Sequence, residues 1–126
     1  MGKRRLSLKV RIPEYQNPRN KWRHQIYKNI RTEIARKHVS YLASDRLELR
    51  IVLYLKKSAI LFHDVDNRLK DIMDALQGRA GGTKQKPTLK PIIQNDNMIF
   101  RVTMEKKIPP KQSLGLGHLV VKKLIE

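Results

Sequence analysis

The stretch RLELRIVLYL, residues 46–55, alternates polar and apolar side chains along its whole length. In an extended chain every second side chain lies on the same face, so this pattern predicts a β-strand with one buried face. That face needs a second layer of structure to pack against. Its apolar members are Leu47, Leu49, Ile51, Leu53 and Leu55.

Two segments, residues 18–38 and 67–77, predict the helices that provide this layer. Their apolar side chains recur at every third or fourth position, which places them on one stripe of a helix. Gly78 follows the second segment and is a suitable helix end. The stripe residues are Trp22, Ile26, Ile30 and Ile34 in the first segment and Leu69, Ile72, Met73 and Leu76 in the second.

Three more segments, residues 5–12, 98–108 and 118–125, also have the patterns of strands. The expected order is therefore strand, helix, strand, helix, strand, strand. We expect one domain over residues 1–126, of the mixed α/β (α+β) class, in which two main helices pack on a single mixed sheet.

The composition is strongly basic, with 28 Lys and Arg against 11 Asp and Glu and a formal charge of +17. Such a charge is tolerated most easily when a polyanion neutralises it, and counterion release then favours binding to nucleic acid. The chain has no cysteine, no apolar run of transmembrane length and no apolar signal segment behind its basic start. We therefore expect a cytoplasmic nucleic-acid-binding protein without membrane association.

The stretch FHDVDNRLKDIMDAL, residues 62–76, concentrates four aspartates in this basic chain. If the chain is extended at HDVDN, Asp64 and Asp66 lie on one face. Asp66 and Asn67 stand where a helix N-cap is expected, and Lys70 follows Asp66 by one turn. Two carboxylates, one ammonium group and the positive end of a helix dipole would then lie at the margin of the buried face.

The other titratable side chains of this stretch have less distinctive positions. On a helical wheel Asp71 points away from the apolar stripe, so we expect it in solvent, and Asp74 is intermediate. His63 is a candidate base or phosphate contact, although a histidine beside such a motif is more often incidental.

Another aspartate, Asp96, lies in the stretch IIQNDNMIF, residues 92–100. A lone aspartate in an asparagine-rich turn is usually a turn former. If the following strand pairs near the strand that leads into Asp64, the carboxylates of Asp64, Asp66 and Asp96 converge. Such oxygen ligands favour Mg²⁺, or Mn²⁺ as a substitute, which polarises a phosphodiester and activates water. Lys70 would then neutralise charge that develops on the phosphate.

Basic side chains on two segments are candidates for contact with a nucleic acid. The polar side of the first helix either faces solvent or follows a phosphate backbone. The loop at residues 78–91 is rich in glycine, proline and basic residues, and we expect a flexible flap that contacts phosphates. The candidates are Lys21, Arg23, Lys28, Arg68, Arg79, Lys84 and Lys86.

The segments DVDNRLKDIMDAL and IIQNDNMI together resemble the RusA family of Holliday junction resolvases. The family pattern is D-x-D-N-x-x-K running into a helix that ends in D-A-L, followed by an acidic pair before a strand. The chain matches the first part from Asp64 to Leu76. In the second part Asp96 matches, but Asn95 replaces the first acidic residue.

The resemblance implies a small homodimeric, Mg²⁺-dependent crossover junction endodeoxyribonuclease that takes part in DNA recombination and repair and uses no small-molecule cofactor. Asp64, Asp66 and Asp96 would be its metal ligands, and Lys70 would complete the catalytic set. The implied reaction hydrolyses two symmetrically placed phosphodiesters of a four-way DNA junction, one per subunit, which suits a two-fold dimer.

Two other hypotheses remain. In one, the protein is a non-catalytic basic nucleic-acid-binding protein whose aspartates cap a helix and a turn. In the other, it is a less selective nuclease for branched DNA on the same fold. The distances between the carboxylates distinguish the non-catalytic protein from an enzyme, because a catalytic site needs the three carboxylates close enough to share a cation.

Overall fold

The computed structural model of the protein describes residues 6–16, 18–55, 60–79, 89–108 and 117–124. Its elements follow the predicted order, with two short 3₁₀ turns, η1 and η2, added before α2 and β3. They are β1 (Leu8–Ile12), α1 (Arg19–Lys37), β2 (Leu47–Tyr54), η1 (Ile60–Phe62), α2 (Val65–Leu76), η2 (Asp96–Met98), β3 (Ile99–Lys107) and β4 (Gly117–Lys123). The predicted α+β class with one mixed sheet and two helices is confirmed.

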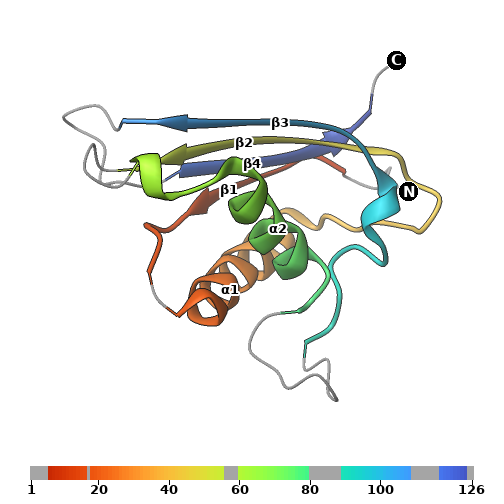
Figure 1. Ribbon diagram of the computed structural model, residues 1–126. Coiled ribbons are helices and arrows are strands. Elements are labelled where there is room, and N and C mark those ends of the chain that lie inside the picture. Colours follow the sequence, from red (N-terminus) through yellow and green to blue (C-terminus); the bar gives the residue numbers. More distant parts are fainter. Residues whose placement is uncertain (1–5, 17, 56–59, 80–88, 109–116, 125–126) are drawn as a thin grey trace.

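The four strands form one sheet in the order β1-β4-β2-β3. β4 is antiparallel to both of its neighbours, and β2 and β3 are parallel. Both helices cover the same face of this sheet (Figure 1). The molecule therefore has two layers, and no helix in the described part of the chain covers the other face.

The covered face of the sheet and the stripe of α1 form the core. Trp22, Ile26 and Ile30 are buried as the helical periodicity predicts, and Ile34 is partly buried. Trp22 also donates from its indole nitrogen to the carbonyl of Pro13 at 2.9 Å, which holds the loop after β1 against α1. The buried strand residues include Leu8, Val10, Ile12, Leu47, Leu49, Ile51, Leu53, Leu119 and Val121.

The connection from β2 through α2 to β3 decides where the acidic segments lie. After α2 the chain passes back under its own last turn, where the amides of Ile92 and Ile93 donate to the carbonyl of Leu76 at 2.9 and 3.1 Å. β3 then begins beside the start of β2, with Ile99 opposite Leu47. Because the two strands are parallel, the segment that follows β2 and the segment that precedes β3 lie at opposite ends of the strand pair.

None of the helices within the described ranges combines the length and the apolarity that crossing a membrane requires.

Candidate functional site

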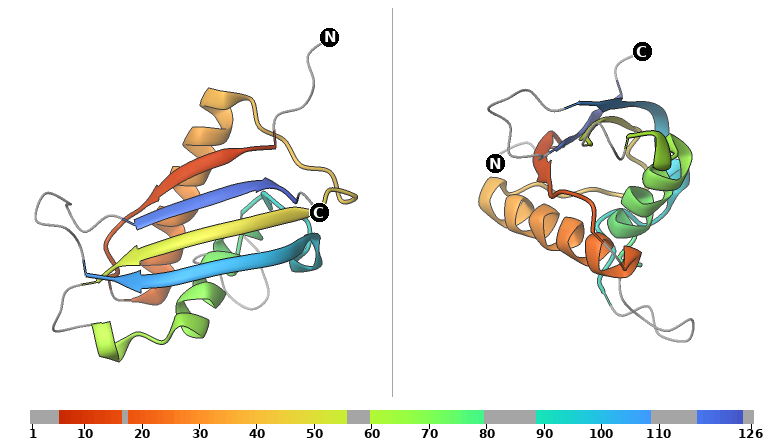
Figure 2. Two further views of the ribbon diagram at one scale, coloured as in Figure 1. Left: turned by 90° about the horizontal axis from the view of Figure 1, so that it is seen from above. Right: turned by 60° about the vertical axis from the view of Figure 1, so that its left-hand side comes forward.

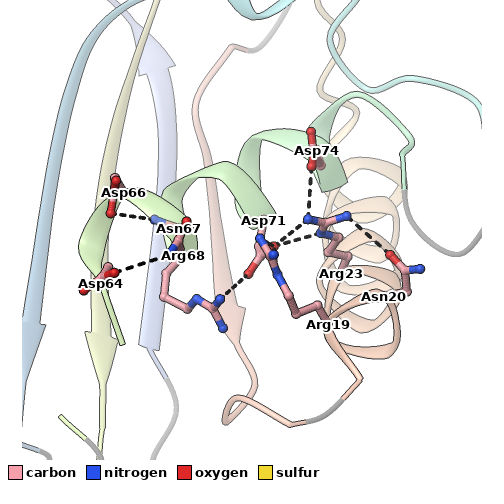
Figure 3. A network of polar contacts seen from close by, with 9 residues as sticks. All are labelled: Arg19, Asn20, Arg23, Asp64, Asp66, Asn67, Arg68, Asp71 and Asp74. Carbon is pink, nitrogen blue, oxygen red and sulfur yellow. Dashed lines mark hydrogen bonds and ion pairs between the residues drawn. The ribbon is translucent and has the colours of Figure 1, made fainter. Parts of the chain in front are cut away.

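The first two candidate carboxylates lie together at the start of α2 (Figure 3). Asp64 is the N-cap residue, and Asp66 lies in the first turn. Asn67 connects them, because its backbone amide donates to Asp66 Oδ1 at 3.0 Å and its side chain donates to Asp64 Oδ2 at 3.3 Å. Both carboxylates are exposed to solvent, as the binding of a cation would require.

The helix begins two residues earlier than its periodicity predicts, and its N-cap is Asp64 instead of Asp66 or Asn67. The backbone of Asp64 is extended, and its carbonyl accepts the first helical hydrogen bond from the amide of Arg68 at 3.1 Å. The expected extended segment is therefore absent at Asp66. The two carboxylates nevertheless lie near one another, because both belong to the first turn of the helix.

Lys70 is exposed on the second turn of α2, one turn after Asp66. Its ammonium group makes no ion pair with a carboxylate in the described part of the chain, and the arrangement of two carboxylates before one lysine agrees with the sequence prediction. The free backbone amides of a helix N-terminus add a positive field at the same place.

His63 is partly buried immediately before this pair. Its ring lies edge-on against the ring of Tyr15, with the centroids 4.7 Å apart. Burial, followed by the positive charges of Arg68 and Lys106, lowers the pKa of His63 below its ordinary value. The imidazole is therefore neutral near pH 7 and is packed as part of the fold.

Asp96 lies at the other end of β3 from this pair. Lys106, near the end of β3, donates from its ammonium to the carbonyls of Ile60 and His63, both at 2.8 Å, and so fixes the segment before Asp64 there. Asp96 precedes the first residue of β3, and the seven residue steps from Ile99 to Lys106 span about 23 Å. Figure 1 shows η2 and η1 at opposite ends of the sheet.

The structure thus does not bring Asp96 to Asp64 and Asp66 within one chain. The strand after Asp96 does pair with the strand that leads toward Asp64, as the converging arrangement requires, but the pairing is parallel and separates the carboxylates. Within the ranges described, no three His, Asp, Glu or Cys side chains form a group that could hold a metal ion. Asp64 and Asp66 by themselves fit Mg²⁺, which commonly takes one or two carboxylates and fills its remaining positions with water and phosphate.

Asp71 is buried, which corrects the expectation that it lies in solvent. Its Oδ1 accepts from Arg19 at 2.8 and 3.0 Å and from Arg23 Nε at 2.9 Å, and Arg68 Nη2 lies 3.3 Å from Oδ2. Three guanidinium groups from two helices therefore surround one carboxylate (Figure 3). Asp74 joins the edge of this cluster through an ion pair with Arg23 at 3.3 Å.

This cluster changes the role of two predicted nucleic-acid contacts. Arg68 is buried, and its guanidinium lies 4.3 Å from the centroid of the Tyr15 ring. Arg23 is largely buried between Asp71 and Asp74. Arg23 therefore joins α1 to α2, and Arg68 packs α2 against Tyr15 in the loop before α1. Neither arginine is placed for contact with a phosphate backbone.

The other predicted contacts have mixed outcomes. Lys21, Lys28 and Arg79 are exposed, as contact with a nucleic acid requires. Lys84 and Lys86 lie outside the described residues, as does most of the predicted flap at residues 78–91.

The uncovered face of the sheet adds a basic surface that the sequence motifs do not indicate. Lys9, Arg11, Arg50 and Arg101 are exposed on it, and the first three alternate with buried residues of β1 and β2. A shallow hollow of about 270 Å³ lies among them, lined in part by Lys9, Arg50 and His118. The signal was present in the sequence, because the polar positions of strands with period-two alternation form the face opposite the core.

No protein-family model matches the chain, and no curated protein matches it. The resemblance to the RusA family therefore remains a prediction that depends on the quoted motifs.

Proposed function

We propose that the protein is a metal-dependent endonuclease that cuts branched DNA, with the four-way junction as its substrate. The observation that carries this proposal is the exposed pair Asp64 and Asp66 at the start of α2, with Lys70 one turn later. Exposed carboxylates repel a phosphate backbone, and this pair lies on a chain of charge +17 that would attract one. A cation bound between the carboxylates and a phosphate would remove that repulsion.

Each side chain of this group has a chemical role in the proposal. Asp64 and Asp66 hold a Mg²⁺ ion through their carboxylate oxygens, and Asn67 orients both carboxylates by its two hydrogen bonds. The bound ion supplies Lewis acidity and lowers the pKa of a water molecule. Lys70 is a positive charge within reach of the phosphate oxygens on which negative charge develops.

The remaining charge positions the DNA in this proposal. Lys21 and Lys28 on α1, and Arg79 after α2, are exposed, and the uncovered sheet face carries four more exposed cations. Contacts of this kind attract the backbone of any DNA, because they carry no information about base sequence. Preference for a junction therefore depends on shape.

A second candidate is a basic DNA-binding protein without catalytic activity. The observation that favours it is the distance of Asp96 from the other two carboxylates. Asp64 is the N-cap residue of α2, but its side chain makes no capping hydrogen bond. The two candidates differ in one measurable property, which is metal-dependent cleavage.

The test incubates the purified protein with an end-labelled four-way junction, with Mg²⁺, with Mn²⁺ and with EDTA. We expect paired nicks with either metal and none with EDTA. Asp66→Asn and Lys70→Ala should each lower the cleavage rate about a hundredfold or more, as the loss of one charge-stabilising group does. Both variants should still bind the junction in a gel-shift assay.

Glu105→Gln is the matched control, since Glu105 is an exposed carboxylate on β3 that makes an exposed ion pair with Lys107 at 3.6 Å. This variant should cleave like the wild type. Normal junction binding without cleavage under any metal condition would leave the non-catalytic protein as the correct reading.

A further inference from the structure

β1 is an open edge of the sheet. It is the first strand in the sheet order, and β4 is its only neighbour among the described strands. In the view from above, β1 lies on the side of the sheet away from η1 and the start of α2 (Figure 2, left). This edge is therefore remote from the acidic pair. An open edge presents unpaired backbone amides and carbonyls to which another strand can bond.

The register of the sheet shows which backbone groups of β1 are unpaired. The amide of Leu124 donates to the carbonyl of Arg46 at 2.9 Å, directly beyond the residue pairs that join β4 to β2. Because the backbone groups of an antiparallel strand point to its two sides alternately, the even-numbered residues of β4 bond to β2 and the odd-numbered ones bond to β1. The odd-numbered residues of β4 lie opposite the even-numbered residues of β1. The amides and carbonyls of Lys9 and Arg11 therefore point out of the sheet.

Asn29 on α1 gives independent evidence for this direction. Its side-chain amide donates to the carbonyl of Arg11 at 3.1 Å, in the way that the amide of a neighbouring strand would. The carbonyl of Lys9 and the amides of Lys9 and Arg11 are left for a further strand.

A groove of about 620 Å³ lies between this edge and α1. The residues that line it from α1 recur at every third or fourth position, so they form one flank of the helix. A groove beside an open edge gives room for the side chains of an added strand. Its polar lining includes Lys9, Arg11, Asn29, Glu33, Arg36 and Lys37.

The groove has an excess of positive charge on both flanks. Its one carboxylate, Glu33, pairs with Arg36 at 2.8 Å and with Lys37 at 3.7 Å. Lys9 and Arg11 are exposed on the β1 flank and make no ion pair in the described part of the chain. Four cations against one carboxylate favour an occupant with negative charge.

The unpaired backbone groups distinguish between the possible occupants. A second copy of β1 carries the same two cations, and like charges on paired strands repel each other. A nucleic acid backbone satisfies the cations, but its phosphates only accept hydrogen bonds and leave the carbonyl of Lys9 without a donor. An extended polypeptide offers donors and acceptors at the spacing of the strand, and it bonds to an exposed edge by strand addition.

We propose that an acidic segment of a partner protein adds to β1 as a further strand of the sheet. Alternate side chains of such a strand point to opposite faces. Its carboxylates on the uncovered face meet Lys9 and Arg11, and those on the other face meet the two cations of α1. This inference does not depend on the proposed function, because the edge lies across the sheet from the acidic pair.

The test uses a fluorescein-labelled peptide of about ten residues in which Glu and Thr alternate. Fluorescence anisotropy with the whole protein should show saturable binding, and the same peptide with Lys in place of Glu should not bind. N-methylation of the backbone amides of the acidic peptide should weaken binding about tenfold or more, because the peptide loses its donors to the edge. Equal affinity for the methylated and unmethylated peptides would overturn strand addition.

Charge reversals on the protein test the place of binding. At about 0.15 M salt, charges more than about 8 Å apart are largely screened. Lys9→Glu and Arg36→Glu should each weaken peptide binding about fivefold or more. Lys107→Glu is the matched control, since Lys107 is exposed on β3 at the opposite edge, and this variant should bind like the wild type. Equal losses in all three variants would show that net charge alone attracts the peptide and would overturn the site.

Hydrogen exchange followed by NMR tests the backbone contact directly. The acidic peptide should slow exchange of the amide of Lys9, which points out of the sheet, and should change the amide of Val10, which bonds to β4, much less. Binding without protection of the Lys9 amide would overturn the proposal, as would equal protection by a single-stranded oligothymidylate of about ten nucleotides. Neither result bears on junction cleavage, which is measured separately.

Discussion

Asp71 allows a quantitative test of how this fold is held together. Asp71→Asn keeps the shape of the side chain but removes the negative charge from a site that is fully buried. Arg19 is 43% exposed and can turn into water, and Arg23 keeps its contact with Asp74. Arg68 is 8% exposed and makes its ion pair with Asp71, so its charge becomes uncompensated.

Removing one partner of a buried ion pair costs about 3–5 kcal/mol, because the remaining charge stays out of water. A domain of this kind has a total free energy of unfolding of about 5–15 kcal/mol, so the loss is a large fraction of it. Urea unfolding followed by the fluorescence of Trp22, the single tryptophan and 1% exposed, measures this difference directly.

Asp74→Asn is the matched control, since Asp74 makes one ion pair at 3.3 Å and is partly exposed. Asp74→Asn should therefore lower the free energy of unfolding by about 1 kcal/mol or less. Adding Arg68→Met to Asp71→Asn should restore part of the stability, because an apolar side chain then replaces the buried charge. A loss below about 1 kcal/mol for Asp71→Asn, with the urea slope unchanged, would refute the view that this carboxylate neutralises a buried cluster.

Three further outcomes follow from single contacts. A Cβ on Gly117 would collide with the carbonyl oxygen of Val52 in the neighbouring strand, so Gly117→Ala should cost about 1–3 kcal/mol in the same urea assay. Tyr27→Phe removes a 2.7 Å hydrogen bond to the carbonyl of Lys90 and should cost about 1 kcal/mol, with a chevron or equilibrium curve as the measurement. Burial and two nearby cations lower the pKa of His118 below its ordinary 6.5 in the folded protein. As pH falls, His118 is therefore protonated in the unfolded chain before it is protonated in the folded protein. Stability should therefore decline as pH falls below about 6.5, and His118→Gln should flatten that decline; an unchanged slope would count against this cause.

The sequence patterns located every strand and both helices because each element buries one face. The alternation of polar and apolar residues predicted both ends of β2 to within one residue. The apolar stripe that starts at Trp22 predicted both ends of α1 equally well. The predicted start of α2 was two residues late, because HDVDN was assigned to an extended segment. Val65 lies four residues before Leu69 and belongs to the same apolar stripe, so the periodicity itself extends to the observed start.

The pairing of strands could not be predicted in the same way. A period of two says which face of β3 is apolar, but not that β3 runs parallel to β2, and this direction decides where Asp96 lies. Burial of Asp71 also depends on distant residues. A helical wheel shows only that Arg68, Asp71 and Ala75 share a side of α2, whereas the arginines of α1 make burial of the charge tolerable.

The position of β4 between β1 and β2 has a consequence for biosynthesis. β4 contains the last strand residues of the sheet, up to Lys123, yet it occupies an interior place, and β1 bonds to no other described strand. A nascent chain that has emerged only as far as β3 can assemble α2 with its parallel strands but leaves β1 unattached. Of the four strands, β1 is therefore synthesised first but has no strand to pair with until β4 has been made. A premature stop codon before residue 117 would remove β4, the strand that joins β1 to β2 and β3.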